Sequence, residues 1–144
     1  MEGLKRFSGV VLILIGAIVA IHTIIEPIYH TSSSDHPYSR IWKIIDPLSA
    51  ISIIVGLEFG YLRIRRTREN PNVKEFIASN ALFYGFVLAA ILFFWNWFGI
   101  SKAAKDFTAV SADVRSLVWT FFDALLPVLN GAMGIHLLRA SNTK

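Results

Sequence analysis

Four apolar runs of membrane-spanning length occupy most of the chain and leave little sequence for any other domain. A helix rises about 1.5 Å per residue, so about 20 apolar residues are needed to cross the hydrocarbon core of a bilayer. The runs reach this length, and they cover residues 7–25, 41–62, 76–99 and 116–138. We therefore predict an all-α integral membrane four-helix bundle, with residues 1–144 forming a single transmembrane domain.

Composition supports this class and excludes several kinds of site. Of the 144 residues, 54% are hydrophobic, which is more than soluble domains of this length carry. The chain has no cysteine, so disulfides and thiolate metal sites are excluded. Lys5 and Arg6 precede the first run, as in a signal peptide, but no small-residue cleavage site follows. We therefore predict a retained first helix.

Basic residues are divided unequally between the two ends of the predicted bundle. Nine lie at the end with both termini and the connector between the second and third runs: Lys5, Arg6, Arg63, Arg65, Arg66, Arg68, Lys74, Arg139 and Lys144. Five lie at the opposite end: Arg40, Lys43, Lys102, Lys105 and Arg115. The positive-inside rule then places the N and C termini in the cytoplasm.

The connector also suggests contact with lipid. Arg63, Arg65, Arg66 and Arg68 are candidates for binding anionic headgroups, at about 1 kcal/mol per basic residue. The simpler interpretation is that these arginines only set the topology.

The second and fourth runs begin in the same way. Trp42 precedes Asp46 by four residues, and Trp119 precedes Asp123 by the same spacing, 77 positions later. This similarity indicates an internal repeat, in which two tandem helical hairpins are related by a pseudo-twofold axis along the membrane normal. Tryptophans gather at membrane–water interfaces, and the predicted interface anchors are Trp42, Trp95, Trp97 and Trp119.

The segments RIWKIIDPLSA (residues 40–50) and FFWNWF (residues 93–98) accompany this repeated start. Together they resemble a pattern of small four-helix membrane proteins in bacteria and archaea. The resemblance extends over most of the chain. It implies no activity, cofactor or site residue.

Each predicted span carries a polar residue at a similar depth near the end opposite the termini. These residues are His22, Asp46, Asn96 and Asp123, and Glu26 lies one turn beyond His22. Carboxylates and imidazoles suit a divalent metal, and neighbouring carboxylates suit proton exchange. His22, Glu26, Asp46 and Asp123 are therefore the candidate metal or ligand residues. In the alternative interpretation, these side chains are structural, because helix dipoles stabilise acids in the first turn and polar groups join neighbouring helices.

A second polar group lies near the end with the termini. Glu58 is an ionisable residue inside a predicted span, which marks it as a functional candidate. Asn80 or Asn130 can hold it at a helix contact, or it can pair with Arg63 or Arg65. Haem is not expected, because His22 and His136 are roughly 20 Å apart along the membrane normal, and one haem cannot bridge them.

Catalytic motifs are absent from the sequence. It has no HExxH, no P-loop and no Gly-x-Ser-x-Gly, and its basic connector is too short for nucleic-acid binding. We therefore expect no enzymatic activity from the chain by itself, although a membrane enzyme with a metal at the candidate acids is a third alternative.

Two functional predictions remain. The first is an accessory or structural subunit of a larger membrane complex, such as a membrane-bound oxidoreductase. Its partners are membrane lipids and other membrane subunits or further copies of itself. The alternative is a self-contained proton- or metal-linked binding or transport protein that uses intramembrane carboxylates.

Overall fold

The computed structural model describes residues 2–33, 38–69, 72–99 and 111–142. This part of the chain forms four helices, α1 (Glu2–Tyr29), α2 (Trp42–Glu69), α3 (Val73–Gly99) and α4 (Ala112–Asn142). Each helix is long and apolar enough to cross a membrane. The predicted all-α membrane fold with four helices is therefore confirmed.

Short polar side chains define two helix starts. The Asn72 side-chain oxygen accepts hydrogen bonds from the backbone N–H groups of Lys74, at 3.0 Å, and Glu75, at 3.4 Å. Ser111 Oγ accepts one from the backbone N–H of Val114 at 3.4 Å. These caps satisfy amide groups in the first turns of α3 and α4 that have no partner within the helix.

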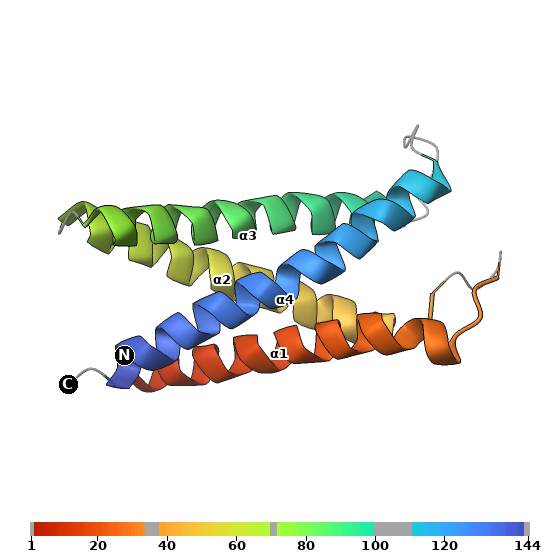
Figure 1. Ribbon diagram of the computed structural model, residues 1–144, viewed down its shortest axis with the longest axis horizontal. Coiled ribbons are helices and arrows are strands. Elements are labelled where there is room, and N and C mark those ends of the chain that lie inside the picture. Colours follow the sequence, from red (N-terminus) through yellow and green to blue (C-terminus); the bar gives the residue numbers. More distant parts are fainter. Residues whose placement is uncertain (1, 34–37, 70–71, 100–110, 143–144) are drawn as a thin grey trace.

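The helices change neighbours from one end of the bundle to the other (Figure 1). Both termini lie at one end, here called the terminal end, and the opposite end is called the distal end. The most extensive contacts join α1 to α4 and α2 to α3. Figure 1 shows α2 and α4 crossing between α1 and α3. The crossing leaves the helix pairs splayed apart toward both ends.

Glycines allow the closest helix contacts. A Cβ atom added to Gly9 of α1 would lie 2.9 Å from the Gly134 carbonyl oxygen of α4, and one added to Gly134 would lie 2.7 Å from the Gly9 carbonyl oxygen. In the other pair, Gly56 of α2 lies directly against the ring of Phe86 in α3. Small residues let helix backbones approach closely in a membrane, where dispersion contacts drive helix association.

Candidate functional site

A cavity of about 240 Å³ opens among α1, α2 and α4 at the distal end. Three helices each contribute one carboxylate to its wall: Glu26 from α1, Asp46 from α2 and Asp123 from α4. The other described lining residues are Thr23, Pro27, Tyr38, Trp42, Ser116, Trp119 and Thr120. None of these lining residues is basic, so the cavity places negative charge beside aromatic rings.

Asp123 and Asp46 lack protein partners within the described part of the chain. Asp123 is 8% exposed, and its Oδ1 atom is buried without a hydrogen bond. Asp46 is half-buried and also receives no hydrogen bond from a described residue. The charges of Asp46 and Glu26 both act on Asp123. A buried carboxylate without a partner is costly, so this arrangement favours a bound cation or a shared proton.

Two prolines each leave one backbone carbonyl group without its helical hydrogen-bond donor, and both carbonyl groups belong to residues of the cavity wall. Pro27 lies inside α1 and Pro127 inside α4. Proline has no backbone N–H, so the carbonyl group four residues earlier loses its usual helical donor. Those carbonyl groups belong to Thr23 and Asp123, and both residues line the cavity.

Glu26 is held in place by two hydrogen bonds. Its Oε1 atom accepts one from the backbone N–H of Ser39 at 2.8 Å, and its Oε2 atom accepts one from Trp42 Nε1 at 2.8 Å. These bonds join α1 to the start of α2. Glu26 is therefore a fixed charge, whereas Asp46 and Asp123 have oxygens available for a ligand.

His22 does not line the cavity, although the sequence placed it among the candidate ligands. The ring is buried, and its Nε2 atom lies 2.6 Å from Tyr29 Oη and 3.2 Å from Ser39 Oγ. The His22 and Trp42 rings are nearly perpendicular, with their centroids 4.6 Å apart. These contacts bind the Nε2 side of the imidazole to Tyr29 and to the connector after α1.

His22, Glu26, Asp46 and Asp123 are candidate residues for a divalent metal or another ligand, and the structure does not bring all four into one group. Among the described residues, no three His, Asp or Glu side chains are grouped closely enough to hold a metal ion. His22 Nε2 and the Glu26 carboxylate contact the Ser39 segment instead, whereas His22 Nδ1 is buried without a partner among the described residues.

The remaining residues predicted near the distal end occupy two different environments. Asn96 of α3 is buried, and neither atom of its amide group has a partner in the described part of the chain. Trp42 and Trp119 line the cavity. Trp95 is 43% exposed on α3, and Trp97 stacks with the neighbouring Phe98 ring.

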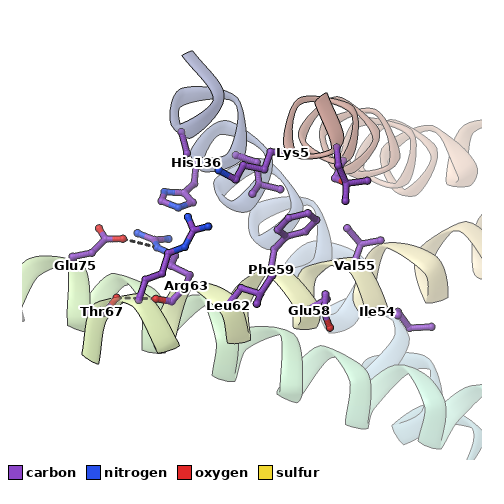
Figure 2. A pocket seen from close by; sticks show the side chains of 15 residues that line it. Lys5, Ile54, Val55, Glu58, Phe59, Leu62, Arg63, Thr67, Glu75 and His136 are labelled. Carbon is purple, nitrogen blue, oxygen red and sulfur yellow. Dashed lines mark hydrogen bonds and ion pairs between the residues drawn. The ribbon is translucent and has the colours of Figure 1, made fainter. Parts of the chain in front are cut away.

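A second cavity, of about 660 Å³, lies at the terminal end (Figure 2). Its wall includes Glu58, Arg63 and Arg66 of α2, together with Lys5 of α1 and His136 of α4. Of the other two predicted headgroup residues, Arg65 and Arg68 are exposed and lie outside this wall.

Glu58 does not form the pairings expected from the sequence. Arg63 Nε donates a hydrogen bond to Glu75 Oε1 at 2.7 Å, and the Asn80 amide donates to the carbonyl of Phe76 in its own helix at 2.8 Å. Gly56 and Gly60 direct their face of α2 toward rings of α3. Glu58 lies two positions from each glycine, on roughly the opposite face, and its side chain is exposed.

A polar contact separates the two cavities along α2 and α4. Asn130 Nδ2 donates a hydrogen bond to Ser52 Oγ at 3.1 Å, and Ser52 Oγ donates to the Ser49 carbonyl at 2.9 Å. All three residues are buried. Asn130 lies seven residues from Asp123, or about 10 Å along the helix.

Several site residues were not identified from the sequence. Thr120 and Ser116 lie one and two turns before Asp123, at a spacing that puts all three on one face of α4. This helical spacing could have identified Ser116 and Thr120 from the sequence. Nothing in the sequence identifies Tyr38, because the position of a connector side chain depends on the folded structure. Lys5 and Glu75 come from distant segments and meet His136 only after α1, α3 and α4 have packed.

The described residues form a bundle of four helices that are long and apolar enough to span a membrane, with an acidic, aromatic cavity at its distal end. Comparisons with protein-family models, curated proteins and solved structures found no match for the chain.

Proposed function

We propose that the protein is a self-contained membrane protein that binds small organic cations in the distal cavity, in competition with protons. The observation that carries this proposal is the convergence of Glu26, Asp46 and Asp123 on one cavity that no described basic residue lines. Two of these acids have no partner among the described residues that balances their charge.

The lining favours an organic ammonium ion over a metal. Trp42 and Trp119 present aromatic rings beside the carboxylates, and such rings attract organic cations by cation–π interaction. A water molecule takes about 30 Å³ in the liquid, so the cavity has room for about eight waters or one small organic cation. The absence of a grouped metal-donor set among the described residues points the same way.

Transport is the second part of the proposal. Cavities lie at both ends of the bundle, and the buried contact between Asn130 and Ser52 lies between them. This arrangement suits a protein that exposes a site to one side at a time. Protonation of Asp46 or Asp123 removes the charge that attracts a cation, so we expect cation affinity to rise with pH.

The test measures choline binding to the purified full-length protein in detergent by isothermal titration calorimetry. We expect choline to bind and its neutral isostere 3,3-dimethylbutan-1-ol to bind at least tenfold more weakly. Asp123→Asn lowers choline affinity at least tenfold, because a buried ion pair is lost. Asp113→Asn, at an exposed site on the same helix, is the matched control and keeps the affinity. Equal binding of the neutral isostere contradicts the proposal.

We also propose the pseudo-twofold repeat and the cytoplasmic location of both termini. A twofold axis would exchange the hairpin of α1 and α2 with the hairpin of α3 and α4. The contact between α1 and α4 would then become the contact between α3 and α2. These are the two most extensive helix contacts of the bundle, which supports the repeat. The excess of basic residues at the terminal end supports the orientation.

A second candidate function is the accessory subunit of a larger membrane complex, such as an oxidoreductase. Its supporting observation is α3, which is the least covered of the four helices and carries exposed Ile91, Trp95 and Phe98. Extraction from the native membrane in mild detergent separates the two functions. Stable co-purification with catalytic subunits supports the accessory role, whereas a chain isolated alone that binds choline supports the cation-binding role.

A further inference from the structure

The cavity at the terminal end is amphipathic along its length. Its lining residues on α2 run from Ile54 to Thr67, which are 13 positions or about 20 Å apart. One leaflet of the hydrocarbon core is roughly 15 Å deep, half of the full thickness. The cavity therefore extends over about one leaflet, measured from the terminal end of α2 toward the middle of the bundle.

Apolar side chains form the part of the cavity nearest the centre. Ile54, Val55 and Phe59 of α2 lie along it (Figure 2). Leu4 of α1 is a further apolar lining residue of the cavity. Ile54 is 60% exposed and Leu4 is 62% exposed. The mouth of the cavity therefore opens on the apolar outer surface of the bundle, where acyl chains can enter.

Basic groups gather at the other end of the cavity. Figure 2 shows Lys5, Arg63 and His136 on facing helices around one opening. Arg63 is engaged by Glu75 at 2.7 Å, and Lys5 by Glu2 at 3.1 Å, which leaves two Nζ protons of Lys5 free. Within the described residues, Arg66 and His136 have no hydrogen-bond or ion-pair partner. Three side chains of the cavity wall, those of Lys5, Arg66 and His136, therefore have donors available to an anion.

We propose that this cavity binds one anionic phospholipid. The phosphate lies at the basic end, where Arg66 provides the planar donor pair that suits phosphate oxygens and Lys5 and His136 add further donors. One acyl chain lies along Ile54, Val55 and Phe59. Glu58 also lines the cavity between the apolar and the basic residues, so its negative charge disfavours a phosphate placed nearer the centre of the bundle.

The test measures phospholipid retained by the purified full-length protein, using native mass spectrometry after exchange into phosphatidylglycerol or phosphatidylcholine. We expect selective retention of phosphatidylglycerol. Arg66→Gln weakens that retention about fivefold, which corresponds to about 1 kcal/mol for one basic residue. Arg65→Gln removes the same charge one position away, outside the cavity, and retains the lipid.

Two controls test whether the variant is misfolded and whether a soluble phosphate is the ligand. Arg66→Lys keeps the charge but not the planar donor pair, so it recovers part of the affinity, which shows that the loss in Arg66→Gln is not misfolding. Glycerol 1-phosphate and inorganic phosphate do not displace the lipid, because they lack an acyl chain. Equal losses in Arg65→Gln and Arg66→Gln overturn the proposal in favour of diffuse surface charge. Displacement by either soluble phosphate overturns it in favour of a soluble ligand.

Discussion

Asp123 shows how a single residue can favour function over stability. It is buried, it has one oxygen without a described partner, and it shares the distal cavity with two further acids. Such a side chain destabilises the empty protein, because taking a charge out of water costs more than its surroundings return. Its position is therefore better explained by ligand binding than by folding.

Replacing this residue has opposite effects on folding and on binding. We expect Asp123→Asn to raise the melting temperature of the ligand-free protein in detergent by a few degrees, since about 1 kcal/mol moves the midpoint by several degrees in domains of this size. The same variant loses choline binding. Thermal unfolding measured by circular dichroism checks the result, and a clear fall in melting temperature would assign Asp123 a structural role.

The depth of each candidate residue was accessible from the sequence, but its direction around the helix was not. A constant rise per residue puts His22, Asp46 and Asp123 near one end of the bundle. Rotation follows from an amphipathic pattern, and these helices are apolar on nearly every side. His22 and Glu26 lie one turn apart, yet only Glu26 lines the cavity, because Tyr29 and Ser39 bind the imidazole.

At the scale of elements, helix lengths were predictable and helix pairs were not. Apolar runs define spans directly, because the bilayer sets a minimum length. Pairing depends on which small residues meet. Gly131 and Gly134 are three residues apart in α4 and look equivalent in the sequence, but a Cβ on Gly134 would meet α1, whereas a Cβ on Gly131 meets nothing within 4 Å.

The two glycines give a matched pair of variants. A Cβ on Gly134 would lie 2.6 Å from Ile13 Cγ1 and 2.7 Å from the Gly9 carbonyl oxygen. We expect Gly134→Ala to destabilise the bundle by about 1–3 kcal/mol, because overpacking forces the helices apart. Gly131→Ala changes stability by less than about 1 kcal/mol, and in the stabilising direction, through helix propensity. Unfolding in detergent with added denaturant compares them, and equal stabilities would contradict a close contact between α1 and α4.

The orientation of the bundle in the membrane can be tested with single introduced cysteines, because the chain has no cysteine of its own that would react. Thr31 is exposed in the connector after α1, and Glu69 is exposed at the end of α2. With the termini in the cytoplasm, a membrane-impermeant maleimide added to intact cells labels Thr31→Cys and not Glu69→Cys. Permeabilised cells are the control in which both are labelled. The reverse pattern places the terminal end outside.

The extensive contact between α1 and α4 has a consequence for biogenesis. These two helices are the first and fourth to leave the ribosome, so α1 enters the bilayer before its main neighbour has been synthesised. Its glycine face, with Gly9 and Gly16, is then covered by lipid or by the insertion machinery until α4 arrives. Folding of the bundle is therefore completed after translation of α4, and a ribosome stalled in the connector before α4 holds a chain with neither cavity.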